Sequence, residues 1–161
     1  MKFYSKKPNK VGGGSKTNKN GLSFEGRTNL IQSLDNNKNI SIVEYNGTIR
    51  VLDYKTGQLQ DLGIMDWTDL ANDPDRGQAR QLLMYAMLWN THNPNNPAGQ
   101  AGIIALKQYK KGVLYVGEKA SPRGKVSPIL AAEQMQKAAL VFEELTQTLF
   151  DPNCPFSEPA A

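Results

Sequence analysis

Cysteine, histidine and long apolar runs are scarce in this chain of 161 residues. One cysteine, Cys154, and one histidine, His92, exclude a disulfide framework and the usual Cys/His zinc sites. Carboxylates therefore remain as the anionic side chains that could hold a metal ion. No apolar run approaches the ~18 residues of a membrane span, and the basic amino terminus lacks the apolar stretch of a secretory signal. We expect a cytoplasmic protein with no membrane partner.

The positive charge of the chain is concentrated at its amino terminus. The net charge is +4, and residues 1–20 hold six of the 19 basic residues and no acid, which leaves 13 basic against 15 acidic side chains elsewhere. A stretch rich in Lys, Asn, Gly and Ser buries too little apolar surface to offset its ordering entropy. We therefore expect a flexible basic arm or linker at 1–20, which could contact phosphate. The folded domain is placed at 21–156 and a tail at 157–161.

A β-hairpin is the clearest local signal in the sequence. Segments 40–45 and 48–53 are rich in β-branched and apolar residues. They flank Asn46-Gly47, the dipeptide that best accommodates the positive φ angles of a two-residue type I′ turn. The pattern predicts two antiparallel strands.

Two helices and two further strands are predicted after the hairpin. Apolar residues at helical spacing indicate a helix from 76 to about 90, and strands are expected at 101–107 and 112–118. A long final helix is expected to open at Pro128 and to end at Asp151-Pro152. The order strand, strand, helix, strand, strand, helix predicts a mixed α/β arrangement around one sheet.

The second strand of the hairpin ends in two charged residues, Asp53 and Lys55. Side chains alternate along a strand, so these two face the same way. A carboxylate that can hold a divalent cation beside an ammonium group suits hydrolysis of a phosphodiester. The metal would polarise the phosphate and activate a water molecule, while the lysine would position that nucleophile or offset charge. By itself Asp-x-Lys is far more often a surface ion pair at a strand end.

The following helix carries Gln81 and Tyr85, four residues apart on one face, with Gln78 alongside. Residues 49–57 (Ile-Arg-Val-Leu-Asp-Tyr-Lys-Thr-Gly) and 81–85 (Gln-Leu-Leu-Met-Tyr) form a pair of motifs at a specific separation. In these motifs the sequence resembles the PD-(D/E)XK nuclease superfamily. In particular, it resembles the RecB-like, AddB-type nuclease domains of bacterial helicase-nucleases that act in DNA repair. The resemblance covers roughly residues 39–156.

This resemblance implies a role for each motif residue. Asp53 would be a metal ligand, and the backbone carbonyl of Tyr54 could supply another. Lys55 would be the catalytic lysine, and Gln81 with Tyr85 would contact DNA or order the active site. The cation would be Mg²⁺ or Mn²⁺, which suit oxygen ligands.

The resemblance also implies a fold, an activity and partners. The fold would be a restriction-endonuclease-like mixed β-sheet flanked by helices. The family also has an amino-terminal core helix, which residues 1–20 cannot form, so we expect this chain to lack it. The activity would be hydrolysis of DNA in the manner of an exonuclease, with a helicase subunit or domain as a possible partner. The alternative is a catalytically impaired nuclease-fold module that binds DNA or scaffolds a helicase complex.

One acidic position of the family pattern is occupied differently in this chain. The family usually places a further acid, within Gly-x-Ile-Asp-Arg, opposite the position of Asp53, and pairing across the hairpin turn puts Ile40 there. If the family strand is instead 24–29, the position is Asn29, a neutral ligand. Other acids that could substitute are Glu25, Asp35 and Glu44.

A group of basic residues is the best candidate in the folded part for contact with phosphate, and a solvated basic edge is the alternative. It lies on the last two predicted strands and the loop after them. Its members are Lys107, Lys110, Lys111, Lys119, Arg123 and Lys125. The residues expected to contact nucleic acid are Gln78, Lys110, Lys111, Arg123 and Lys125.

Overall fold

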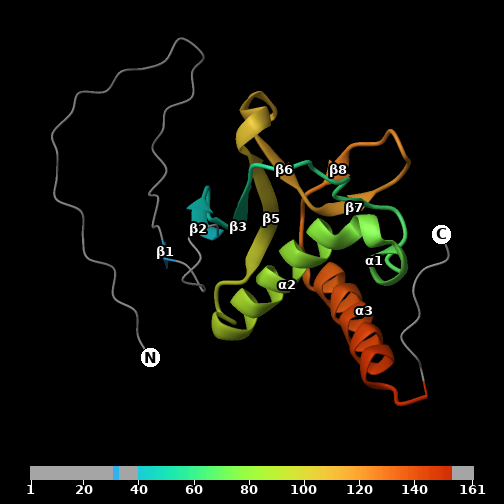
Figure 1. Cartoon of the computed structure of the whole chain (residues 1–161). Coiled ribbons are helices and arrows are strands. Elements are labelled where there is room, and N and C mark those ends of the chain that lie inside the picture. The colour runs from blue at the N-terminus through green and yellow to red at the C-terminus, as the bar shows by residue number, and fades with distance from the viewer. Residues whose placement is uncertain (1–30, 33–39, 154–161) are drawn as a thin grey trace, which may run out of the picture.

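The computed structural model describes residues 31–32 and 40–153 (Figure 1). Three predicted parts lie outside these residues: the arm at 1–20, the start of the domain and the tail at 157–161. The prediction that the amino-terminal core helix is missing also concerns residues outside the described part. In the described part of the chain, no helix combines the length and apolar character needed to cross a bilayer.

The predicted hairpin is confirmed. Strands β2 (Ile40–Tyr45) and β3 (Thr48–Lys55) pair in antiparallel fashion, with Tyr45 opposite Thr48 at the turn. Asn46 and Gly47 have φ angles of 50° and 73°, the left-handed conformation that a type I′ turn requires. This turn fixes the register of the whole hairpin, because a slip by one residue would reverse the faces of every side chain.

The hairpin belongs to a five-stranded mixed sheet in the order β1-β2-β3-β5-β6. Strand β1 (Ile31–Gln32) is antiparallel to β2, β5 (Ala98–Ala105) is parallel to β3, and β6 (Val113–Tyr115) is antiparallel to β5. A 3-10 segment, η2 (Leu106–Lys111), joins β5 to β6. The predicted mixed sheet flanked by helices is therefore confirmed.

The prediction of one sheet with a continuous strand at 112–118 is wrong. The chain leaves the first sheet after β6 and enters a second, three-stranded sheet of β4 (Gly63–Ile64), β7 (Gly117–Lys119) and β8 (Val126–Ser127). Gly117 permits this crossing, because a Cβ at this position would overlap the backbone carbonyl of Ser127. The preceding residue, Val116, is fully buried.

Three α-helices are described: α1 (Asp69–Asn72), α2 (Gly77–His92) and α3 (Ala132–Phe150). The start of α2 is prepared by the 3-10 turn η1 (Pro74–Arg76), where the Asp73 carboxylate accepts a hydrogen bond from the Asp75 amide. The predicted bounds of α2 are confirmed to within two residues, whereas α3 begins four residues after the predicted Pro128.

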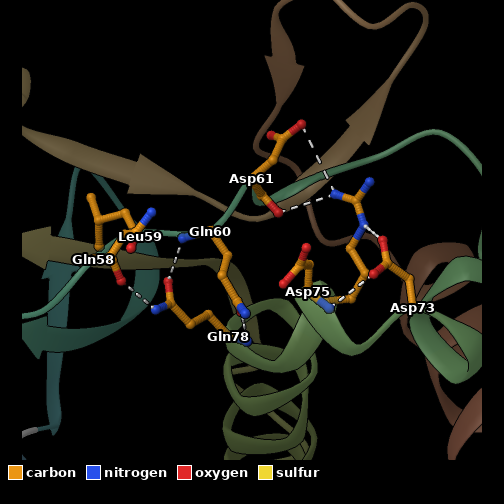
Figure 2. A pocket seen from close by; sticks show the side chains of 8 residues that line it. Gln58, Leu59, Gln60, Asp61, Asp73, Asp75 and Gln78 are labelled. Atoms are coloured by element: carbon orange, nitrogen blue, oxygen red, sulfur yellow. Dashed lines mark hydrogen bonds and ion pairs between the residues drawn. The ribbon is translucent and has the colours of Figure 1, made fainter. Parts of the chain in front are cut away.

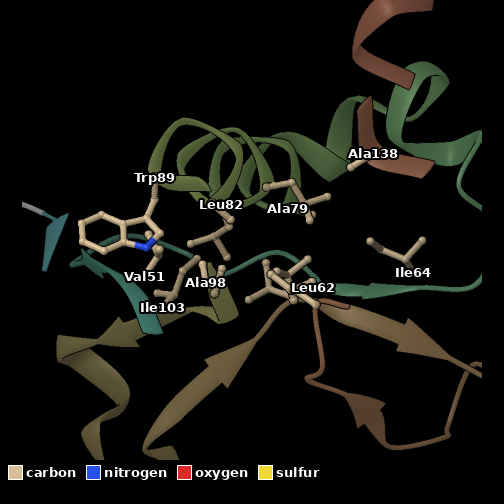
Figure 3. Close-up of a cluster of buried hydrophobic side chains, with 14 of the residues drawn as sticks. Val51, Leu62, Ile64, Ala79, Leu82, Trp89, Ala98, Ile103 and Ala138 are labelled. Carbon is tan, nitrogen blue, oxygen red and sulfur yellow. The ribbon is translucent and has the colours of Figure 1, made fainter. Parts of the chain in front are cut away.

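The main hydrophobic core lies between α2 and the five-stranded sheet (Figure 3). Helix α2 turns one face to the strands, and Val51 of β3 and Ile103 of β5 pack beneath it. The buried residues on that helix face are Ala79, Leu82, Leu83, Ala86 and Trp89. Figures 1 and 3 show the three helices on the same side of this sheet. The packing holds the neighbouring face of α2, which carries Gln81 and Tyr85, beside the end of β3.

A polar cluster ties the second sheet to α3. The Glu118 carboxylate of β7 accepts a hydrogen bond from the Trp67 indole at 3.0 Å and one from Lys137 of α3 at 3.0 Å. Lys137 also forms an ion pair with Glu133 at 2.8 Å. The cluster links a loop, a strand and a helix that are far apart in the sequence.

Candidate active site

Asp53 lies near the carboxyl end of β3 in an apolar setting. The residue is 2% exposed, and its neighbours across the sheet are Ile40 on β2 and Ile103 on β5. Its Oδ2 atom lies 3.0 Å from Lys55 Nζ, close enough for an ion pair. Among the described residues, the Lys55 ammonium is the group that balances the charge of this buried oxygen. Carboxylate oxygens are also ligands that divalent cations prefer.

Lys55 follows two residues later on the same face of β3, as the alternation of the strand predicts. Its side chain is 28% exposed, so the ammonium group lies at the boundary between the core and solvent. Besides its ion pair with Asp53, Nζ donates a hydrogen bond of 2.8 Å to Gln81 Oε1 on α2. The ammonium is thus held between a strand and a helix.

Gln81 and Tyr85 complete this arrangement from α2. Gln81 Nε2 donates to the Tyr85 hydroxyl oxygen at 2.9 Å, one helical turn away. The two bonds of Gln81 define its orientation, because its oxygen must face the ammonium and its nitrogen the phenol. The structure therefore brings Asp53, Lys55, Gln81 and Tyr85 into one contact row, which we call the catalytic row after the role predicted for it.

Tyr54 lies between Asp53 and Lys55, and the alternation of β3 sends its side chain to the opposite face of the sheet. Its Cα is paired with that of Ile104 on β5. Only its backbone carbonyl could serve the catalytic row, and the role of that carbonyl as a metal ligand stays a prediction.

Gln78 has a set of contacts that the sequence did not suggest. Its amide oxygen accepts from the Gln60 backbone amide at 3.0 Å, and its amide nitrogen donates to the Gln58 carbonyl at 2.9 Å. In return, Gln60 Oε1 accepts from the Gln78 backbone amide at 2.8 Å. Gln78 thus fastens the segment after β3 to the start of α2, and its contact with nucleic acid stays a prediction.

A cleft of about 490 Å³ lies beside the hydrogen bonds between Gln78 and the segment after β3 (Figure 2). Arg76 crosses one side of it and donates hydrogen bonds to the carbonyls of Asp61 and Gly63 at 3.1 and 2.9 Å. The cleft is lined by Gln58, Leu59, Gln60, Asp61, Asp73, Asp75, Arg76 and Gln78. The sequence did not reveal that Gln58, Gln60 and Arg76 join the segment after β3 to the start of α2 through hydrogen bonds. None of them belongs to a motif or to a periodic pattern.

Asp61 is the most strongly paired acid on this cleft. Partial burial raises the pKa of its carboxyl, but three groups lower it by more: a 2.8 Å bond from Lys119, a bond from the Gly63 amide and the charge of Arg76. The resulting pKa lies below the ordinary value, so this side chain stays ionised and tied to its partners.

The predicted phosphate-contacting residues lie on two segments. Lys110 and Lys111 are exposed on η2, and Arg123 and Lys125 are exposed on the loop between β7 and β8. Figure 1 shows these segments apart, with η2 at the far end of β5. The prediction that all four contact nucleic acid remains open, but they do not form one compact patch.

The donor set suits a divalent cation only in part. Asp53 offers a carboxylate oxygen that is paired with Lys55, whereas the facing residue of β2 is Ile40, which is 8% exposed. Among the described residues, no three His, Cys, Asp or Glu side chains come together as a metal-binding group. Glu44 is exposed beside the hairpin turn, at the opposite end of β2 from Ile40. The other acids considered as substitutes, Glu25 and Asp35, and the alternative ligand Asn29, lie outside the described residues.

Comparison with known proteins gives one family match. The model of the PD-(D/E)XK nuclease superfamily matches residues 12–160, which is most of the chain. No curated protein and no solved structure gives a significant match.

Proposed function

Because this chain belongs to the PD-(D/E)XK nuclease superfamily, we propose that it hydrolyses DNA phosphodiester bonds with the help of Mg²⁺ or Mn²⁺. The superfamily suggests a nuclease with DNA as the substrate, and its members generally use divalent metals. The further proposal is that this is a RecB-like, AddB-type exonuclease domain that works with a helicase in DNA repair.

The observation that carries this proposal is the catalytic row. Four polar side chains from two elements, separated by up to 32 positions in the sequence, lie in direct contact through separations of 2.8 to 3.0 Å. A chance surface ion pair would not need an amide and a phenol to fix its ammonium group. Side chains fixed in this way at the end of a buried strand are typical of a site that positions a reacting molecule.

Asp53, with the Tyr54 carbonyl, would hold the cation. When bound, the cation supplies charge that polarises the phosphate and makes a bound water more acidic. Lys55 is placed to orient the attacking water and to offset the negative charge that grows on the phosphate oxygens. Water oxygen bonds to phosphorus, the bond to the leaving oxygen breaks, and a proton passes to that oxygen. Gln81 and Tyr85 keep Lys55 Nζ in place during this exchange.

The test is cleavage of linear and circular DNA, single- and double-stranded, in 10 mM Mg²⁺, in 1 mM Mn²⁺ or in excess EDTA. The proposal expects cleavage that EDTA abolishes, and an exonuclease degrades only the linear forms. Cleavage that is unchanged in EDTA would contradict the metal-dependent chemistry. Cleavage of circular DNA would contradict the exonuclease assignment alone.

A second candidate function is a catalytically impaired module that binds DNA or scaffolds a helicase complex. The observation that favours it is Ile40, whose apolar side chain lies opposite Asp53 where the family usually has an acid. Hard cations are held by the summed charge and number of their ligands, so one carboxylate gives a weak site. DNA binding without cleavage, even at 20 mM Mg²⁺ or Mn²⁺, would favour the module over the enzyme.

A further inference from the structure

The face of the central sheet that points away from α2 carries a stack of an arginine and two tyrosines. Arg50 belongs to this face because its neighbours on β3, Ile49 and Val51, are both buried in the core on the other side. Its guanidinium carbon lies 4.3 Å from the centre of the Tyr45 ring and 5.7 Å from that of Tyr115. These side chains come from β2, β3 and β6, so the stack spans most of the sheet.

Gly102 makes this arrangement possible. Strand β5 separates β3 from β6, and Gly102 on β5 is paired with Leu52 on one side and Tyr115 on the other. A Cβ at Gly102 would lie 3.1 Å from Tyr115 Cδ1 and 2.8 Å from Val113 Cγ1. Because no side chain occupies this space, the Tyr115 ring can lie close over β5 and reach Arg50.

Two buried polar atoms on the same face lack partners. Arg50 Nε and Gln100 Oε1 have no hydrogen-bond partner among the residues that the structure describes. They belong to directly paired positions on β3 and β5, so a donor and an acceptor stand side by side. Buried polar atoms are rarely left unpaired, and an ordered water molecule is an ordinary partner for such a donor and acceptor.

The helices α1, α2 and α3 all lie on the opposite side of the sheet (Figure 1). On this face Tyr45 is 36% exposed, whereas Leu52 is buried. Three exposed lysines, Lys107, Lys110 and Lys111, follow directly on η2, which joins the strands that carry Gln100 and Tyr115. No ion pair neutralises these lysines within the described residues. The rings therefore lie on a sheet whose end carries positive charge.

We propose that this face is a second nucleic-acid site, which binds unpaired bases of single-stranded DNA. The bases stack on the Tyr45 and Tyr115 rings beside the Arg50 guanidinium, as single strands do on aromatic platforms. The lysines of η2 contact phosphates. Paired bases already stack on one another inside a duplex and cannot use such a platform. An acidic peptide would engage the cations but would leave the ring faces unused.

This site is separate from the catalytic row. Arg50 precedes Asp53 by three residues, about 10 Å along the strand, and the two side chains lie on opposite faces. The inference goes beyond the proposed cleavage and does not depend on it. A strand bound here would be held close to the edge where the catalytic row lies.

The experiment measures binding of a fluorescent 15-nucleotide single strand to the full chain by anisotropy, in EDTA so that no cleavage interferes. The variants are Tyr45→Leu, which alters an exposed ring, Tyr115→Leu, and Arg50→Lys, which keeps the charge but loses the flat guanidinium and Nε. We expect each to weaken single-strand binding about tenfold. The matched control is Lys137→Met on α3. It removes a cation that lies 6.0 Å from the centre of an aromatic ring, that of Trp67. It should stay within twofold of the parent.

Circular dichroism melts establish that each variant is folded, and a 15-base-pair duplex serves as the comparison ligand. Folded variants with unchanged single-strand affinity would overturn the proposal, as would equal losses for strand and duplex. A parent chain that does not bind the strand would also overturn it. Lys55→Met should lose cleavage and keep single-strand binding, so failure of the nuclease assignment and failure of this site give different results.

Discussion

Replacing Ile40 with aspartate is the most informative change to the proposed metal site. Ile40 faces Asp53 across the β2–β3 pair, and both residues are buried. Cβ atoms of directly opposed residues in an antiparallel pair lie about 4.5–5.5 Å apart. Ile40→Asp would therefore put two carboxylates within reach of one cation.

The cost of this change without metal follows from the setting. At about 5 Å and an effective dielectric constant of about 20, two negative charges repel by about 3 kcal/mol. Loss of a buried isoleucine adds about 2–4 kcal/mol. The sum approaches the total stability of an ordinary domain, about 5–15 kcal/mol, so the metal-free variant should be only marginally folded.

A cation should recover much of this loss in the variant alone. Metal at about 100 times its dissociation constant stabilises the folded state by about 2.7 kcal/mol. In a domain of this size, that corresponds to a rise in Tm of about 10 °C. The parent chain, with one carboxylate, should gain about 2 °C or less at the same concentration, because its site is weak.

The assay is thermal unfolding by circular dichroism at 0 and 10 mM Mg²⁺, with Ile40→Asn as the matched control. Asparagine has the size and polarity of aspartate but not its charge, so it should show a small metal response like that of the parent. An Ile40→Asp variant whose Tm rises no more than that of Ile40→Asn would refute the reasoning that this position faces the cation.

Three further results are expected. Gln81→Ala removes the acceptor that holds the Lys55 ammonium and should lower kcat/KM for DNA cleavage about tenfold, the equivalent of one charged hydrogen bond. A steady-state assay with unchanged kcat/KM would contradict this. Gly117→Ala should lower the free energy of unfolding in urea by at least about 2 kcal/mol, because the added Cβ meets backbone, whereas Gly57→Ala, with open space around it, should change it little. A hydrogen bond from Lys137, and then one from an indole, hold the pKa of Glu118 below its ordinary value of 4.5. That stabilisation is present above the unfolded pKa and is lost as pH falls through the lower folded pKa, so Glu118→Gln should flatten the loss of stability in urea melts between about pH 5 and 3.

Local signals in the sequence were sufficient for the hairpin and for each half of the catalytic row, whereas the contact between the halves, from Lys55 to Gln81, joins residues 26 apart and was expected only from the family resemblance. Asn46-Gly47 specifies a turn through backbone conformation, and the turn fixes which residue faces Asp53. Alternation along β3 then places Lys55 beside it, and helical spacing places Tyr85 one turn from Gln81. Each of these relations depends on neighbours in the chain, so a periodic pattern could predict it.

The errors came from interactions between distant segments. The predicted strand at 112–118 is broken because Ser127 of β8, which is 10 residues further along the chain, lies close to Gly117. The hydrogen bonds between Gln78 and Gln60 depend on how the connection after β3 folds back toward α2. No pattern of residues in the sequence predicts the path of that connection. The Arg50 stack likewise depends on a glycine two strands away from Tyr45, which local spacing cannot reveal.

The central claim is that the catalytic row hydrolyses phosphodiester bonds with Lys55 in direct contact with the reaction. The most direct measurement is the rate of metal-dependent cleavage of linear DNA by the parent chain and by Asp53→Ala and Lys55→Ala, all purified in the same way. The account predicts cleavage by the parent and a loss of at least about 100-fold in both variants, because each removes charge that acts on the transition state. Cleavage that persists at the parental rate in either variant would contradict it.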